Sequence, residues 1–243
     1  MNAAVFLRPN PVPGRDGYRH EFKYVIDPLQ KAGLRHRLPA VLQRDAHAGK
    51  DGVYTIRSLY FDDAEDRCLL ENKNGTDPRE KFRIRIYGAD PSTARLECKR
   101  KEAGKTHKTA CGVGIALIEE LLRDGRFRLP EDAPPLLAKL FVLQETRGMR
   151  PVVVVEYDRE PYVLPEGNVR VTLDLDLRAT ARADAFLDRE LPARPVMPCG
   201  KDLLEVKYDA FLPDAVYRTM QTDGLSRTTF SKYYYCRKLG GLG

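Results

Sequence analysis

The sequence predicts a single α+β domain, and three observations support this prediction. Several segments alternate apolar with polar residues, as half-buried antiparallel strands do, among them residues 18–26, 81–87 and 168–178. Helix-like segments, such as residues 115–123 and 134–144, lie between them. No repeat of fixed period and no convincing linker interrupts the 243 residues, of which 42% are hydrophobic, so one sizeable core can form.

The expected elements follow from local patterns along the chain. Residues 1–17 are rich in proline and glycine and predict a flexible leader, and residues 18–239 are then one domain. Asp27 and Pro28 predict a helix start, with Asp27 as the N-cap. Alternation predicts strands at 18–26, 54–62, 81–87, 94–100, 106–110, 151–159, 168–178 and 203–208. Apolar spacing predicts helices at 29–42, 63–72, 115–123, 134–144 and 209–220, and a helix or mixed segment at 227–238.

Composition narrows the partners without identifying one. The formal charge is +6, which favours anionic partners such as nucleic acid, phospholipid headgroups or phosphorylated small molecules. Charged residues make up 31% of the chain, so the placement of the charges decides among these. The cations alternate along strands and do not gather on one helix or in a lysine-rich tail, so no nucleic-acid partner is expected.

The cysteines and the chain start favour a cytoplasmic protein. The five cysteines are scattered and odd in number, which argues against a disulfide framework and against a zinc site. The first residues show no basic segment followed by an apolar one, so no secretory signal is expected. No apolar run approaches the roughly 20 residues needed to span a bilayer, so no membrane segment is expected in this chain.

Ionisable residues occupy one face of several predicted strands. Carboxylates stand two positions from cations, which is the same strand face about 6–7 Å away. Such strands can also belong to an ordinary antiparallel sheet whose polar face is exposed to solvent. Recurrence of the pattern instead favours an interior site, and a closed barrel with this lining would be a charged tunnel. The cations are Lys23, Arg83, Arg85, Lys99 and Lys207, and the carboxylates are Glu21, Glu97 and Glu205.

This lining suits phosphate chains. Arginine presents a planar fork to two oxygens, and lysine a compact charge. Interspersed carboxylates can hold Mg²⁺ or Mn²⁺, which bridge phosphate oxygens. In residues 168–178 the predicted polar face carries Arg170, Thr172, Asp174, Asp176 and Arg178. Asp174 and Asp176 are metal-ligand candidates, and equally they are candidates for ion pairs with interior arginines.

Seven segments in order resemble the VTC domain, the polyphosphate polymerase module of the vacuolar transporter chaperone complex, within the triphosphate tunnel metalloenzyme (CYTH-like) superfamily. They are HEFKYVI (20–26), SLYFDD (58–63), EKFRIRIYG (80–88), LECKRK (96–101), RPVVVVEYDRE (150–160), LLEVKYD (203–209) and SRTTFSKYYYCRKL (226–239). The resemblance implies an antiparallel eight-stranded β-barrel, the triphosphate tunnel, with helices packed around the outside. It also implies that ATP extends inorganic polyphosphate with Mn²⁺ or Mg²⁺ as cofactor.

The resemblance also implies roles for single residues. Lys23, Arg83, Arg85, Lys99 and Lys232 are the expected catalytic cations. Glu205 matches the metal-holding glutamate, and Glu21, Glu97, Asp174 and Asp176 are further metal candidates. Arg57 is added by its strand position, and Lys207 by its place on the charged strand face. The expected phosphate-binding residues are Arg57, Lys108, Arg150, Arg159, Lys207 and Ser231.

One departure from the superfamily bears on the reaction. Its opening ExExK pattern has Arg19 here in place of the first glutamate, which resembles the polymerase branch more than a two-metal triphosphatase. Three functions stay open at this point. The chain could synthesise polyphosphate from ATP, hydrolyse inorganic triphosphate or nucleoside triphosphates, or bind polyphosphate without catalysis. Regulatory and membrane partners are also open, because these 243 residues include no counterpart of those parts of the eukaryotic complex.

Overall fold

A computed structural model describes residues 20–49, 51–88, 90–220 and 225–240. The predicted leader at 1–17 and Arg19 lie outside the described residues. The helices are α1 (Pro28–Arg37), α2 (Arg67–Asn74), α3 (Ile115–Asp124), α4 (Pro135–Arg147), α5 (Asp214–Met220) and α6 (Lys232–Gly240). The strands are β1 (His20–Ile26), β2 (Gln43–Arg44), β3 (Tyr54–Asp62), β4 (Arg79–Tyr87), β5 (Asp90–Glu102), β6 (Lys105–Gly112), β7 (Arg150–Leu164), β8 (Val169–Thr180), β9 (Arg194–Pro195), β10 (Asp202–Tyr208) and β11 (Arg227–Thr228).

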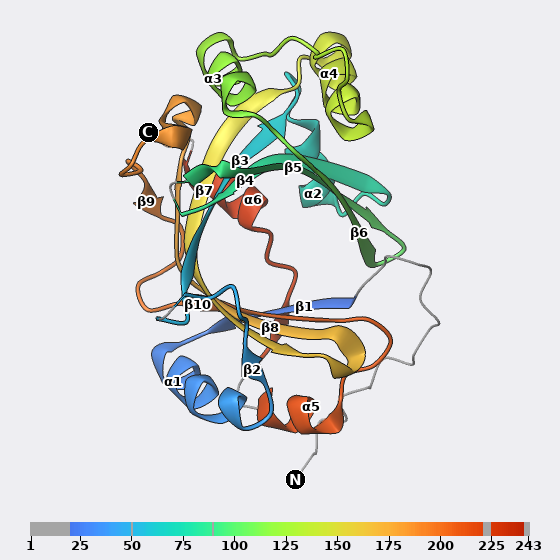
Figure 1. Ribbon diagram of the computed structural model, residues 1–243. Coiled ribbons are helices and arrows are strands. Elements are labelled where there is room, and N and C mark those ends of the chain that lie inside the picture. The colour runs from blue at the N-terminus through green and yellow to red at the C-terminus, as the bar shows by residue number, and fades with distance from the viewer. Residues whose placement is uncertain (1–19, 50, 89, 221–224, 241–243) are drawn as a thin grey trace.

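All strands of the described residues belong to one antiparallel sheet. The main path is β11-β1-β10-β8-β7-β3-β4-β5-β6, while β2 joins β7 and β9 joins β8. The sheet curls, so that β4, β5 and β6 face β1, β10 and β8 (Figure 1). The α+β class is confirmed.

The expected closed barrel of eight strands is wrong on two points. The sheet has eleven strands among the described residues, because three two-residue strands, β2, β9 and β11, pair at its margins. The sheet is also open, because no backbone ladder joins β6 to β1 in the described part of the chain. The register explains why. β1 pairs with β10 along one edge, and β11 pairs with the other edge of β1 at Lys23 and Tyr24, so β6 cannot pair with β1 there.

Helices cover the outer surface of both halves of the curled sheet (Figure 1). α1 and α5 pack beside β1, β10 and β8, where Leu34 and Val216 join the buried residues Val171 and Val206 in one apolar cluster. α3 and α4 contact β5, and α4 also contacts β6. α6 lies between the two halves and contacts β7 and β8. None of the helices described is long and apolar enough to cross a membrane.

The predicted start of α1 is confirmed at atomic detail. The Asp27 carboxylate accepts a hydrogen bond from the Gln30 backbone N–H at 2.8 Å, and the Gln30 side chain accepts one from the Asp27 N–H at 2.9 Å. Pro28 occupies the first turn, where its missing N–H costs nothing. This reciprocal cap satisfies two N–H groups that a helix start leaves without intrahelical partners.

A bulge at Asp176 reverses the alternation in β8. Glu156 and Asp158 of β7 pair with Arg178 and Leu175, so β8 carries one extra residue between them. Asp176 has φ of 49°, the left-handed conformation that such a bulge accommodates. The expectation that Arg178 shares a face with Asp174 is therefore wrong. Arg178 instead donates to Glu156 at 2.9 Å on the opposite face of the sheet.

Candidate functional site

The register of the antiparallel pairs brings ionisable side chains from seven strands to the concave side of the sheet. Residues directly opposite each other in such pairs share a face. Lys23 lies opposite Glu205, Arg83 opposite Glu97, and Lys99 opposite Lys108. We call this concave surface the inner face. Its ionisable residues include Glu21, Lys23, Lys81, Arg83, Arg85, Glu97, Lys99, Lys108, Arg159, Arg170, Asp174, Glu205 and Lys207.

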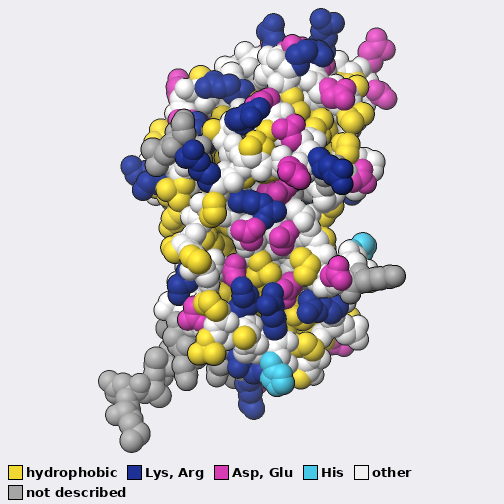
Figure 2. All heavy atoms as spheres, turned by 90° about the vertical axis from the view of Figure 1, so that its left-hand side faces the viewer, with side chains coloured by type: hydrophobic (Ala, Val, Ile, Leu, Met, Phe, Trp, Pro, Cys, Tyr) yellow, Lys and Arg dark blue, Asp and Glu magenta, His cyan; other side chains and the backbone are white. Residues whose placement is uncertain are grey.

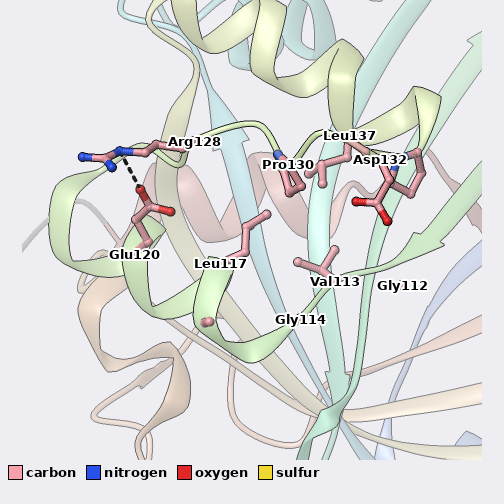
Figure 3. A pocket seen from close by; sticks show the side chains of 12 residues that line it. Gly112, Val113, Gly114, Leu117, Glu120, Arg128, Pro130, Asp132 and Leu137 are labelled. Atoms are coloured by element: carbon pink, nitrogen blue, oxygen red, sulfur yellow. Dashed lines mark ion pairs between the residues drawn. The ribbon is translucent and has the colours of Figure 1, made fainter.

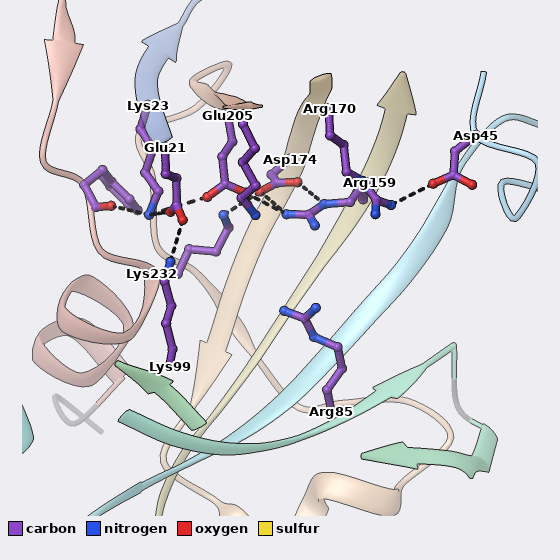
Figure 4. A network of polar contacts seen from close by, with 12 residues as sticks. Glu21, Lys23, Asp45, Arg85, Lys99, Arg159, Arg170, Asp174, Glu205 and Lys232 are labelled. Atoms are coloured by element: carbon purple, nitrogen blue, oxygen red, sulfur yellow. Dashed lines mark hydrogen bonds and ion pairs between the residues drawn. The ribbon is translucent and has the colours of Figure 1, made fainter. Parts of the chain in front are cut away.

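Lys23 lies at the centre of the inner face. Its ammonium contacts Glu21 at 3.1 Å and Glu205 at 3.6 Å, and donates to the Phe230 carbonyl at 3.1 Å. The second oxygen of Glu21 accepts from Lys99 at 2.6 Å (Figure 4). Because Lys99 belongs to β5 and Glu21 to β1, this ion pair joins the two facing halves of the sheet directly.

A second cluster surrounds Asp174, a fully buried carboxylate of β8. Arg159 donates to both its oxygens, at 2.6 and 2.8 Å, in the forked geometry that arginine favours. Lys232, the first residue of α6, contacts Asp174 at 2.5 Å (Figure 4). Arg159 also reaches Glu205 at 3.3 Å, and Lys207 contacts Glu205 at 3.0 Å. The two clusters are therefore one continuous network.

A third group lies on β4, β5 and β6. Arg83 contacts Glu97 at 2.7 Å and donates to the Tyr60 hydroxyl at 2.8 Å. Lys108 contacts Glu97 at 3.0 Å, and Arg85 lies 3.9 Å from it. The Arg85 Nε is buried and has no hydrogen-bond partner among the described residues.

Each carboxylate of the inner face contacts at least two cations, so cations outnumber carboxylates and the inner face carries excess positive charge. Burial opposes ionisation of Glu21, but Lys99 and Lys23 together lower its pKa to about 2. Burial likewise opposes ionisation of Glu97, and Arg83, Arg85 and Lys108 hold its pKa well below the usual range. The opposite holds for Lys99, where burial, only partly offset by Glu21, lowers the pKa to about 8. These carboxylates are thus ionised. An incoming anion would favour the charged form of Lys99, which burial disfavours.

Most of the predicted residues meet on this face, and four lie apart from it or at its border. Arg57 points to the opposite face, where its guanidinium donates to Glu156 at 2.5 Å and to the Phe186 carbonyl at 3.0 Å. Arg150 is exposed at the start of β7, and Asp176 is exposed at the bulge. Ser231 lies at the border, where its hydroxyl accepts from Lys81 at 3.2 Å.

Three further residues lie on the inner face that the sequence patterns did not predict as site residues. Lys81 lies directly opposite Lys99, and Arg170 donates to Asp45 and to the Tyr54 hydroxyl, both at 2.8 Å. The Tyr60 hydroxyl orients Arg83. Lys81 and Arg170 continue the alternation that identified Arg83 and Asp174, so the same signal could have found them.

The carboxylates expected to hold a metal do not form a preassembled metal site. Among the described residues, no group of three or more His, Cys, Asp or Glu is placed to hold an ion. Glu21 and Glu205 nevertheless both face the Lys23 ammonium. Mg²⁺ commonly takes only one or two carboxylates and completes its shell with phosphate oxygens and water. The residues present therefore fit an ion that arrives with a phosphate chain.

A cavity away from the inner face has a different character. It has a volume of 550 Å³ and lies between the end of β6, α3 and α4, lined by Val113, Leu117, Pro130 and Leu137 (Figure 3). Its arginine, Arg128, lies 3.8 Å from Glu120. The lining is mainly apolar and its arginine is paired, so this cavity offers an anion no cluster of cations like that of the inner face.

The outer surface adds no second candidate on the side shown in Figure 2. Basic and acidic side chains are interspersed there, with hydrophobic residues between them. Nucleic-acid-binding proteins typically present a continuous basic stripe. This side of the molecule presents none.

The chain belongs to the VTC domain family, whose model matches residues 18–239. No curated protein matches the sequence significantly. Among solved structures, a Hippeastrum protein described as an adenylyl cyclase candidate with a dominant triphosphatase activity has a similar fold. Its TM-score is 0.50 at 14% identity, over 91% of this chain and 95% of that one. An adenylate cyclase candidate from Bacillus halodurans gives a TM-score of 0.46 at 12% identity, over 84% of this chain and 87% of that one.

Proposed function

We propose that this protein is a polyphosphate polymerase-like phosphotransferase, which passes the terminal phosphoryl group of ATP to a growing polyphosphate chain. The observation that carries the proposal is the shared use of carboxylates on the inner face. Glu21, Glu205 and Glu97 each contact two or more cations but carry only one negative charge, so positive charge remains for an anion. Membership of the VTC domain family supports the same substrate class.

The transfer would form one bond and break one. A terminal oxygen of the acceptor chain bonds to the γ-phosphorus, the bond from that phosphorus to the β-bridging oxygen breaks, and ADP leaves. Such a reaction needs in-line positioning and neutralised oxygens more than covalent help from the protein. Lys23, Lys99 and Lys232 approach the centre of the inner face from β1, β5 and α6, so they can hold a phosphate from three directions.

A divalent ion fits this proposal as a partner of the phosphates. Glu21 and Glu205 would hold Mg²⁺ or Mn²⁺ together with phosphate oxygens, and when bound the ion supplies further charge neutralisation. We expect Glu205→Gln to abolish metal-dependent turnover while anion binding persists. Mn²⁺ affinity, followed by the paramagnetic relaxation of water protons in the presence of triphosphate, tests this apart from activity. Unchanged Mn²⁺ affinity would contradict the assignment.

Product analysis tests the reaction itself. The purified protein is incubated with ATP and Mn²⁺, and the products are resolved on a gel. A ladder of polymer supports the polymerase. Free phosphate without polymer would instead indicate a triphosphate hydrolase. The triphosphatase activity of the Hippeastrum protein favours this alternative. Binding of polyphosphate with neither product would leave a non-catalytic binding module.

A further inference from the structure

Three cations continue the inner face toward solvent, where β4 begins and β5 ends. Arg79 lies directly opposite Lys101, and Lys81 lies directly opposite Lys99. We call Arg79, Lys81 and Lys101 the basic track. Alternate residues along a strand share a face, so the track is in line with Arg83 on β4 and with Lys99 on β5.

The track lacks the carboxylates found elsewhere on the inner face. Among the described residues, no carboxylate lies within 4.0 Å of the charged nitrogens of Arg79, Lys81 or Lys101. Lys81 has neutral acceptors instead, the side-chain oxygens of Asn72 and Ser231. Arg79 donates to the Thr76 carbonyl at 2.6 Å, while its Nε is buried and has no hydrogen-bond partner in the described part of the chain.

This arrangement is unfavourable while no anion is bound. Like charges directly opposite each other destabilise a sheet, and here two such pairs are adjacent. Burial, followed by the charges of Lys99, Lys23 and Arg79, lowers the pKa of Lys81 to about 7. Burial and Arg79 also lower the pKa of Lys101, although Glu21 and Asp77 act in the opposite direction. Unfavourable local choices of this kind concentrate at functional sites, where a ligand relieves them.

Side-chain exposure increases from Arg85 through Arg83 to Lys99. The side chain of Arg85 is 9% exposed, that of Arg83 17% and that of Lys99 36%. Lys81, Arg79 and Lys101 are half-buried at the outer end. A linear polyanion that starts at the centre of the inner face can therefore leave along this line and stay in contact with cations.

We propose that the basic track binds the distal phosphates of a polyphosphate chain longer than triphosphate. This subsite rests on the proposed function, because it extends the same phosphate site. Triphosphate is held by the central cations, and only a longer chain reaches Arg79 and Lys101. The track therefore favours long acceptor chains over short ones.

Binding of two ligands tests the subsite. The affinities of the full chain for inorganic triphosphate and for long-chain polyphosphate are measured by calorimetry at several salt concentrations. We expect Lys101→Gln to weaken long-chain binding about ten-fold more than triphosphate binding. The salt dependence of long-chain binding should fall by about one ion. The double variant Lys81→Gln/Lys101→Gln should enlarge both effects.

Lys201→Gln is the matched control, because it removes one exposed lysine that precedes β10 and does not belong to the basic track. It should leave the ratio of the two affinities unchanged. Removing a cation from the track should also keep or raise the melting temperature, since like-charge repulsion is relieved. An unchanged affinity ratio in a folded Lys101→Gln protein would overturn the subsite alone. A wild-type protein that binds neither ligand would overturn the proposed function as well.

Discussion

The two faces of the sheet use arginine in opposite ways. On the outer face, Arg57 donates to Glu156 at 2.5 Å and to the carbonyls of Phe186 and Asp188, so the group is satisfied within the protein. On the inner face, Arg83 shares Glu97 with two other cations, and charge is left over. The same alternating sequence pattern therefore builds a structural ion pair on one face and a surface with excess positive charge, our candidate ligand site, on the other.

Removal of Arg57 should show the largest effect, and on stability alone. Among the described residues, the Arg57→Ala substitution leaves the buried Glu156 with the half-buried Arg178 as its one cation. We therefore expect the free energy of unfolding to fall by about 3–5 kcal/mol. Urea unfolding measures this loss. The folded fraction should bind triphosphate as the wild type does. Weakened binding by the folded fraction would instead place Arg57 in the phosphate site.

Arg83→Ala should give the reverse result. We expect triphosphate affinity to fall by about ten-fold to one hundred-fold, because a charged contact is lost. Stability should change less than in Arg57→Ala, since Glu97 keeps Arg85 and Lys108. Arg126→Ala, which removes an exposed arginine from a loop, is the control. Equal affinity in both variants would show that Arg83 does not contact the anion.

How far the sequence predicts this distinction depends on the residue. It predicts the strands around Lys23, Arg83 and Glu205 and their polar faces. It does not show which face curls inward, so it predicts Arg57 and Arg83 alike as site residues. The bulge at Asp176 depends on one residue in a left-handed conformation. The alternation of apolar and polar residues in the sequence does not reveal such a conformation. The long-range pairing of β11 with β1, which leaves the sheet open, also has no local signature.

Tyr233→Phe tests how α6 is held against the inner face. The Tyr233 hydroxyl donates to the buried Asp62 carboxylate, which also accepts from the N–H groups of Cys68 and Leu69 at the start of α2. Because those backbone donors remain, we expect the free energy of unfolding to fall by only about 1 kcal/mol. Thermal unfolding measures it. A larger fall in triphosphate affinity than in stability would show that Tyr233 also positions Lys232.

The smallest expected effect is proton uptake at Lys81 on anion binding. Burial and the neighbouring cations Lys99, Lys23 and Arg79 lower the pKa of Lys81 to about 7, with Cys68 opposing them. A bound anion favours the charged amine and raises that pKa. At pH 8 the free amine is mostly neutral, so binding should take up part of a proton, while at pH 6 it should take up little.

Calorimetry in buffers of different ionisation enthalpy measures this uptake. Lys81→Met should abolish the Lys81 share, and the control Lys201→Met should retain it. Equal uptake in the wild type and in Lys81→Met at pH 8 would assign the proton to another group.

The incomplete sheet has a mechanical consequence. The two facing halves are connected by backbone hydrogen bonds through β7 and β3, while across the opposite side the contact between Lys99 and Glu21 is made by side chains. One side of the molecule is thus held by a continuous backbone ladder, and the other side includes an ion pair between side chains. Under the proposed function, a phosphate that binds Lys99 would compete with Glu21 for the ammonium group. This contact between the two halves would then weaken while the backbone ladder between the strands stays intact.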